Sequence, residues 1–275
     1  MRHPYIIDLH CTFQTKTKLV YIFRCLPGAW LKTVLQKNKT LSEDQAKFYI
    51  AEIVLAVNAL HQRDIICRDL RPETIFIDHE GHVCLADLML ARENVSQPAS
   101  GANSFRGSLA YLAPDMLKRN GYGKALDWYM VGQLLYHLLV GSLPYYALSQ
   151  QRMIENILSG PIKMPRSMSA QAADLVISLL HRNPLKRLGS GPSGAQEIMD
   201  HFFFANFDWD QLQYRVNHRF ETNIANFDVF KFLPDFDAGQ IDQIFEEPEV
   251  DAELEEIEGW YYVNPKKQNF KQTSK

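Results

Sequence analysis

The sequence lacks three features that would assign it to a specialised class of protein. Its four cysteines form no CxxC pair and have no histidine at metal-ligand spacing, which argues against zinc and favours reduced thiols. It has no excess of positive charge, since the formal net charge is -3, and a mildly acidic chain is not drawn to nucleic acid or anionic membranes. It also lacks an unbroken apolar run, because Gln133, His137, Gly141 and Pro144 interrupt the most apolar stretch, 128–148. This stretch is expected to be a core helix and not a membrane span.

The opening segment, MRHPYIIDLHC, contains charges and a proline where a secretion signal requires an unbroken apolar run. No secretion is therefore expected, and the reduced thiols indicate a cytoplasmic protein, without a nucleic-acid partner and without a membrane span. With 275 residues, 46% of them hydrophobic, the chain can bury one large core, or one core and a small second lobe.

The patterns of apolar residues predict a mostly helical chain with a few short strands. YIIDL and KLVYIF, on either side of the polar turn TKTK, are typical of a two-stranded hairpin. A serine start signal, acidic residues in the first turn and apolar residues at helical spacing predict a helix over 42–61. Short strands are expected around TIFID and HVCLAD, and further helices over 125–140 and 170–180.

The end of the sequence changes character near residue 204. No lysine or arginine occurs between Phe232 and Pro265, and EEPEVDAELEEIE is crowded with acidic residues. Such a stretch cannot form a core of its own. It is expected to be a tail, either draped over the domain or free.

Three short strings carry the chemistry: CRDLRPET at 67–74, ADLMLA at 86–91 and YLAPD at 111–115. In this order they resemble the catalytic loop, the metal-binding loop and the end of the activation segment of a protein kinase. LDWYMVGQLLYHLLVGSLPYY, LHRNPLKRLG, NFDVF and EGWYYVNP extend the resemblance over nearly the whole chain to the AGC group of serine/threonine kinases. The chain is similar to protein kinase C, the cAMP-dependent kinase and the G-protein-coupled-receptor kinases, and the choice among them stays open.

The resemblance implies an α+β protein-kinase-like fold, mainly the helical large lobe with a remnant of the small-lobe sheet. It divides the chain into a small-lobe remnant over 1–26, a large lobe over 27–203 and an AGC-type tail over 204–275.

The resemblance also implies roles in phosphoryl transfer, together with departures from the usual pattern. Asp69 would be the base, Arg71 would stand in place of a phosphate-contacting lysine, and Asp87 would hold Mg²⁺. Thr74 takes the place of the asparagine that binds the second metal, and a hydroxyl is a poorer ligand than an amide oxygen. Met89 replaces a glycine, which would restrict the metal-binding loop.

ATP would lie at the hinge near Phe23 and Cys25, over Phe76. The sequence, however, contains no glycine-rich phosphate loop and no VAIK-like lysine, since it begins at a segment similar to the fourth strand of the small lobe. ATP binding is therefore expected to be weak or absent. The remaining hairpin would present an open edge to a partner strand.

Other residues are expected to support the fold. By resemblance, Arg187 pairs with Asp115, and Asp127 braces the catalytic loop. Arg68 would receive a phosphate on Ser104, the best-placed hydroxyl of the activation segment, or Ser104 stays an unmodified surface serine.

In the tail, Phe227, Ile257 and Trp260 would be apolar anchors, docked weakly on the domain or bound to another kinase. Near the catalytic loop, Glu73 could meet a basic substrate residue, but Trp30 stands where related kinases often carry a second acidic residue. A strong preference for basic substrates is therefore not expected.

Two functions from different classes follow from these residues. One is a catalytically impaired, kinase-like interaction protein. The alternative is an active ATP-dependent Ser/Thr kinase whose small lobe is missing from this sequence, and a third possibility is a decayed product without function.

Overall fold

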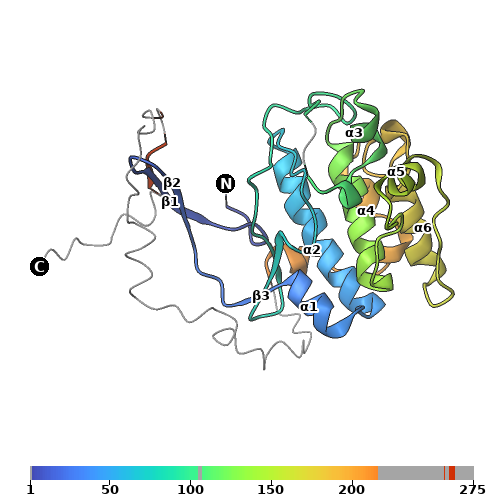
Figure 1. Ribbon diagram of the computed structural model, residues 1–275. Helices are drawn as coiled ribbons and strands as arrows, with labels where there is room; N and C mark the ends of the chain where they lie inside the picture. The colour runs from blue at the N-terminus through green and yellow to red at the C-terminus, as the bar shows by residue number, and fades with distance from the viewer. Residues whose placement is uncertain (1, 105–106, 216–256, 258–259, 264–275) are drawn as a thin grey trace, which may run out of the picture.

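The computed structural model describes residues 2–104, 107–215, 257 and 260–263. Figure 1 shows a helical lobe joined to a small sheet that projects away from it. The described residues are therefore mainly helical with short strands, as the sequence predicts. The helices are α1 Leu31–Asn38, α2 Glu43–His61, α3 Pro114–Lys118, α4 Ala125–Val140, α5 Gln150–Ser159, α6 Ala170–Leu179, α7 Ala195–Met199 and α8 Trp209–Gln213. The strands are β1 Leu9–Gln14, β2 Leu19–Phe23, β3 Gly28–Trp30, β4 Ile75–Asp78, β5 Val83–Leu85 and β6 Tyr262–Val263.

Helix α2 begins where its sequence predicts. Ser42 accepts a hydrogen bond from the backbone N–H of Gln45, and the Gln45 side chain accepts one from the N–H of Ser42. This reciprocal cap satisfies two amide groups that a helix start otherwise leaves unpaired. Most residues of α2 are buried, so the helix runs through the lobe and not along its surface.

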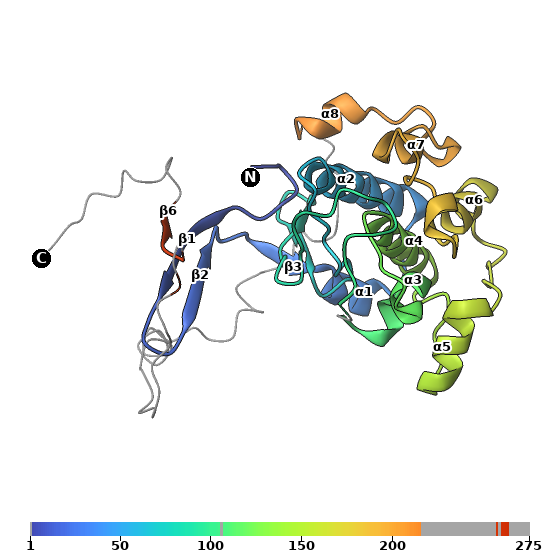
Figure 2. The ribbon, with the colours of Figure 1, turned by 90° about the horizontal axis from the view of Figure 1, so that it is seen from above.

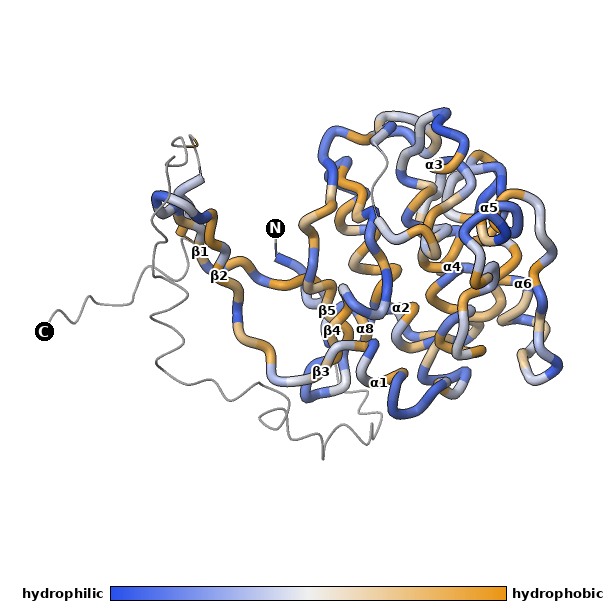
Figure 3. Tube along the Cα trace, in the orientation of Figure 1, coloured by the Kyte–Doolittle hydropathy of each residue, from blue (hydrophilic) through white to orange (hydrophobic). Residues whose placement is uncertain are grey.

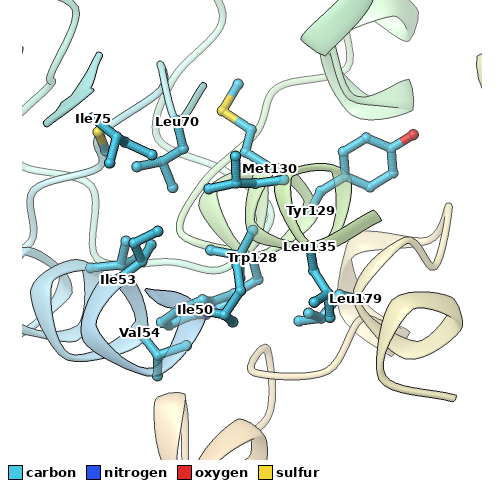
Figure 4. Packing of buried hydrophobic residues seen from close by; sticks show 14 of the residues in the cluster. Ile50, Ile53, Val54, Leu70, Ile75, Trp128, Tyr129, Met130, Leu135 and Leu179 are labelled. Atoms are coloured by element: carbon cyan, nitrogen blue, oxygen red, sulfur yellow. The ribbon is translucent and has the colours of Figure 1, made fainter. Parts of the chain in front are cut away.

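Helix α4 is the second central helix, and it packs on α2 and α6 (Figures 1 and 4). Ile50 and Val54 of α2, Trp128 of α4 and Leu179 of α6 are all 0 to 1% exposed. Gly132 lets α4 approach α6 closely, since a Cβ at this position would lie 2.7 Å from the Cβ of Leu179. Close packing of this kind makes even small changes of volume costly.

The described residues form two antiparallel three-stranded sheets. The order β3-β4-β5 brings together strands that precede and follow the loop at residues 67–74. The order β2-β1-β6 adds a strand from near the end of the chain to the hairpin. The sequence predicts only two strands here, and the third comes from residues 248 positions away in the chain, as the hydrogen bond from Thr12 to the Trp260 carbonyl shows.

The first strand of the hairpin lies further along the chain than its pattern predicts. YIIDL was expected to form this strand, but β1 begins only at Leu9. Tyr5 and Ile6 are buried in the lobe, and the backbones of Tyr5 and Ile7 exchange hydrogen bonds with Leu85 of β5. The apolar run therefore extends the lobe sheet before the chain leaves for the hairpin.

The hairpin is apolar yet exposed. Figure 2 shows it standing apart from the helices, and Figure 3 shows that much of it is hydrophobic. Within the part of the chain that the structure describes, β2 forms the edge of its sheet. Its side chains at Leu19, Tyr21, Ile22 and Phe23 are 38 to 39% exposed.

Candidate active site

The loop at residues 67–74 is anchored by Asp127, which lies in the first turn of α4. Its carboxylate is 0% exposed and accepts hydrogen bonds from the N–H groups of Cys67, at 2.8 Å, and Arg68, at 2.9 Å. His61 Nε2 lies 2.7 Å from the same carboxylate. These three partners offset the cost of burying the carboxylate, and the two backbone hydrogen bonds fix the position of the loop that continues to Asp69.

Asp69 and Arg71 meet on this loop. Arg71 Nε donates to Asp69 Oδ1 at 2.7 Å, and this hydrogen bond raises the pKa of the Arg71 guanidinium. Asp69 is only 6% exposed, whereas Arg71 is half-buried. The pair therefore presents a carboxylate acceptor beside a permanent positive charge, which is the combination needed to take a proton close to an anionic group.

Thr74 is oriented toward its own loop. Its hydroxyl lies 2.6 Å from the carbonyl of Asp69 and 3.0 Å from that of Arg71, and it accepts from the N–H of Arg71 at 3.3 Å. The residue is 2% exposed. This hydroxyl closes the turn of the loop, so it is not free to act as the metal ligand that its position implies.

Asp87 follows β5 and lines a cavity of about 920 Å³. One of its oxygens, Oδ1, accepts from the N–H of Met89 at 2.9 Å. Met89 is 65% exposed and does not have a positive φ, so the structure places no glycine-requiring backbone there. The expected strain from a side chain at this position is absent in this conformation.

The residues expected to hold ATP are not all together. Phe23 lines the same cavity as Asp87, along with Ile7, Leu9 and Trp30. Cys25 is exposed outside the cavity lining, and Phe76 packs its ring against Trp30 at 5.3 Å. The cavity has the volume and the apolar walls typical of a small-molecule site.

The acidic groups offer a limited site for Mg²⁺. Among the described residues, no group of three or more His, Cys, Asp and Glu side chains could hold a metal ion. Asp87 is an oxygen ligand of the kind that Mg²⁺ prefers, but Thr74 is engaged elsewhere. Mg²⁺ could therefore be held by the Asp87 carboxylate together with phosphate oxygens of the nucleotide. Thr74 would not provide a second protein ligand.

Arg68 connects the loop at residues 67–74 to Ser104 and Tyr122. Its Nη1 donates to Ser104 Oγ at 2.8 Å and to Tyr122 Oη at 3.1 Å, and its Nε donates to the carbonyl of Leu90 at 2.5 Å. Its φ of 67° is unusual for a residue with a side chain. The guanidinium is therefore already beside the hydroxyl that the sequence nominates for phosphorylation.

Asp115 and Arg187 lie together in the lobe. The guanidinium makes two hydrogen bonds to the carboxylate, at 2.7 and 3.2 Å, and a third to the carbonyl of Ala125. Both side chains are almost fully buried. The pair ties the start of α3 to the start of α4.

The tail contacts the hairpin through Trp260. Its indole N–H donates to the carbonyl of Phe13 at 2.9 Å, and its ring lies against Tyr21 with centroids 5.0 Å apart. Ile257 donates its backbone N–H to Gln14 but is itself 45% exposed. Phe227 and most of the acidic run lie outside the described residues.

One buried polar cluster has no sequence signal. Glu52 of α2 lies 2.5 Å from His82 Nδ1 and accepts the N–H of Val83 at 2.6 Å. Burial raises the pKa of Glu52 to about 7, against the lowering effect of these hydrogen bonds. The residues are 30 positions apart, so only a resemblance between whole chains could have paired them.

Comparison with known proteins gives a consistent result. The family model described as the protein kinase domain matches residues 1–204, and this match confirms the expected α+β kinase-like fold. The chain is 39% identical over 240 residues to ribosomal protein S6 kinase alpha-3 of Mus musculus, covering 86% of this chain and 32% of that protein. It is 37% identical over 226 residues to RAC-beta serine/threonine-protein kinase of Homo sapiens, covering 82% and 47%. The chain thus spans about a third to a half of the length of these relatives. None of the described helices is long and apolar enough to cross a membrane.

Proposed function

The chain belongs to the protein kinase domain family and is related to AGC kinases, and from this premise we propose that it phosphorylates serine or threonine side chains of proteins with ATP. The pairing of Asp69 with Arg71, on a loop held by the buried Asp127, is the observation that carries the proposal. We further propose that residues 1–26 belong to the small lobe, 27–203 to the large lobe and 204–275 to the tail, and that the protein acts in the cytoplasm.

In the proposed reaction, the oxygen of the substrate hydroxyl bonds to the γ-phosphorus of ATP while Asp69 accepts the proton of that hydroxyl. The bond between the γ-phosphorus and the β–γ bridging oxygen breaks, and ADP is released. Arg71 holds Asp69 in place and contributes positive charge. When bound, ATP with Mg²⁺ supplies the phosphoryl group and further cationic charge. Asp87 would hold the ion.

A second candidate is an interaction protein with impaired catalysis. It is favoured by Thr74, whose hydroxyl is bonded within its loop and 2% exposed, because such a site lacks the second metal ligand. Binding of Mg-ATP separates the two candidates. At a Mg-ATP concentration of about 100 times the dissociation constant, binding raises the free energy of unfolding by about 2.7 kcal/mol, which a thermal-shift assay detects.

Transfer of labelled phosphate from ATP to a serine peptide tests the first proposal. The assay uses the chain itself. Asp69→Asn should lower transfer by about 100-fold or more without changing nucleotide binding, as expected for a base. Asp210→Asn, which changes an exposed carboxylate of α8, is the matched control. Equal transfer by Asp69→Asn and the unmodified protein would remove Asp69 from the mechanism.

A further inference from the structure

Residues 92–104, here called segment 92–104, are paired with the helical lobe near both of their ends. At the first end, the backbones of Arg92 and Ile66 exchange two hydrogen bonds of 2.9 Å each. Near the other end, Ala102 donates to the Tyr122 carbonyl at 3.0 Å, and Tyr122 donates to the Ala102 carbonyl at 2.8 Å. Backbone pairing of this kind restricts local opening, so the segment is part of the lobe and not a free loop.

A buried anchor lies between these two pairings. Val95 is 0% exposed, and its N–H donates to the carbonyl of Asp64 at 2.8 Å. Gly101 lies against it, since a Cβ at Gly101 would be 3.1 Å from Cγ1 of Val95. The Asp64 carboxylate accepts from Lys124 Nζ at 2.7 Å, immediately before α4. The anchor therefore ties the middle of the segment to the residue that precedes the helix.

Segment 92–104 also caps helix α4. The carbonyl of Gln97 accepts from the N–H of Lys124, and the carbonyl of Pro98 accepts from the N–H of Ala125, both at 3.0 Å. Among the described residues, no side chain caps this helix. The N–H groups at a helix start lack partners within the helix and carry partial positive charge. The two carbonyls of the segment therefore take the place of an N-cap side chain.

The capped turn of α4 holds the catalytic loop. Asp127 lies two residues after Ala125. Its carboxylate accepts from the N–H groups of Cys67 and Arg68 at 2.8 and 2.9 Å. Asp69, the proposed base, follows directly. A shift of the helix start would therefore move the carboxylate that positions the loop, and proton transfer requires a fixed position of Asp69.

Gly123 makes this close approach possible. A Cβ at this position would lie 2.0 Å from the Gln97 carbonyl oxygen and 2.7 Å from that of Ser100. Both distances are well inside van der Waals contact, so any larger residue would push the segment away from the start of α4. The φ of Gly123 is not positive, so the position requires glycine for space and not for its backbone conformation.

Ser104 contributes one of several contacts at the end of the segment. Its hydroxyl accepts from Arg68 Nη1 at 2.8 Å. Arg68 also donates to the hydroxyl of Tyr122 at 3.1 Å, and this hydroxyl donates to the carbonyl of Ser104 at 2.7 Å. The backbone of Ser104 is therefore held even when its side chain is removed. The backbone pairings, the buried anchor and the helix cap involve other residues.

We infer that segment 92–104 is a fixed support of the catalytic loop, that Gly123 is the positioning residue on which it depends, and that its order does not require a phosphate on Ser104. The inference rests on the proposed function for its bearing on phosphoryl transfer, and it names the regulation of that site. The support is built into the fold, so the unmodified chain has its catalytic loop in place.

Hydrogen exchange of the whole chain, produced in bacteria and treated with phosphatase, tests the support without catalysis. Gly123→Ala should speed exchange of the amides of Val95 and Ala125 by about tenfold or more, because the Cβ separates the segment from α4. The amides of Cys67 and Arg68 should follow, since they depend on the position of the helix start. Exchange in α6 should not change.

Two variants serve as controls. Ser96→Ala changes an exposed residue of the segment and should alter exchange by less than about twofold. Gly132→Ala places a Cβ 2.7 Å from that of Leu179 in the core, so it should speed exchange throughout the lobe and lower its stability. The first variant controls for substitution in the segment, and the second controls for a general loss of folding.

Modification of Ser104 gives the second test. Ser104→Ala and the chain carrying phosphoserine at position 104 should both keep the exchange of Val95 and Ala125 within about twofold of the unmodified chain. If the phosphate slows exchange of these amides by about tenfold or more, the segment needs it and the inference is wrong.

The inference is also overturned if Gly123→Ala exchanges like Ser96→Ala, or if it speeds exchange uniformly as Gly132→Ala does. Where phosphate transfer is measured, Gly123→Ala should lower kcat by about tenfold and change the KM for the peptide by less than about twofold, since it misplaces Asp69 without removing a binding group. Selective exchange without transfer keeps the support and removes the kinase activity. Transfer with uniform exchange keeps the activity and removes the support.

Discussion

The helical lobe and the β2-β1-β6 sheet contain similarly apolar side chains but bury them very differently. Trp128 of α4 is 1% exposed, whereas Tyr21 and Phe23 of β2 are 38 and 39% exposed. Helices pack against neighbours on several sides, while the sheet has one tail segment on its β1 edge. The comparison teaches that hydrophobicity alone does not make a core, because burial also needs a partner surface.

Their polar groups differ in the same way. The lobe contains paired charges with almost no exposure, such as Arg187 with Asp115. The sheet is held by backbone ladders and by single bonds such as that from Trp260 to Phe13. We therefore expect single substitutions of buried groups in the lobe to lower the free energy of unfolding strongly. We expect the sheet to open locally without unfolding of the lobe.

The largest expected effect is the loss of one buried charge partner in the lobe. Arg187→Met leaves the Asp115 carboxylate buried and unpaired, which should lower the free energy of unfolding by about 3–5 kcal/mol in urea titrations. Arg152→Met breaks an exposed pair with Glu155 and should cost less than about 0.5 kcal/mol. Similar losses in both variants would mean that burial does not govern these pairs.

A smaller effect concerns pH. Because the folded-state pKa of Glu52 is about 7, above the ordinary 4.5, the folded state holds this proton more tightly than the unfolded state. The contribution of this proton to the free energy of unfolding is fully present below about pH 4.5, and it is lost as the pH rises to about 7. Glu52→Gln should remove this dependence, on the order of 1 to 3 kcal/mol, when unfolding is measured across that range.

Parallel pH curves for Glu52→Gln and the unmodified protein would contradict this assignment. Glu155→Gln, at an exposed position of α5, serves as the matched control and should leave the shape of the curve between pH 4.5 and 7 unchanged.

The smallest effect belongs to the sheet. Trp260→Ala removes the ring packed on Tyr21 and the donor to Phe13. The free energy of local opening of β1 and β2 should therefore fall by about 1–2 kcal/mol, and their amide hydrogens should exchange faster. Exchange in α2 and α4 should not change. Tyr261→Ala, beside it and 80% exposed, should leave the sheet as it is. Faster exchange throughout the lobe would show that the two regions are coupled.

Local sequence signals predicted the main helices. Residues 42–61 and 125–140 carry their own caps, periodicity or breakers, and the structure has α2 over Glu43–His61 and α4 over Ala125–Val140. The order of the three motifs predicted the kinase fold, because a shared ordered set of loops reflects a shared chain path.

The sequence by itself therefore determined what depends on near neighbours: the limits of the helices and the turn at 15–18. It nominated Asp69 and Asp87 as candidate site residues. Only the tertiary structure decided where the first strand begins, that the Thr74 hydroxyl turns into its loop, and that segment 92–104 caps α4. These features depend on groups distant in the chain or on competition among hydrogen-bond partners. Residue type states which contacts a side chain can make, and packing selects which of them it makes.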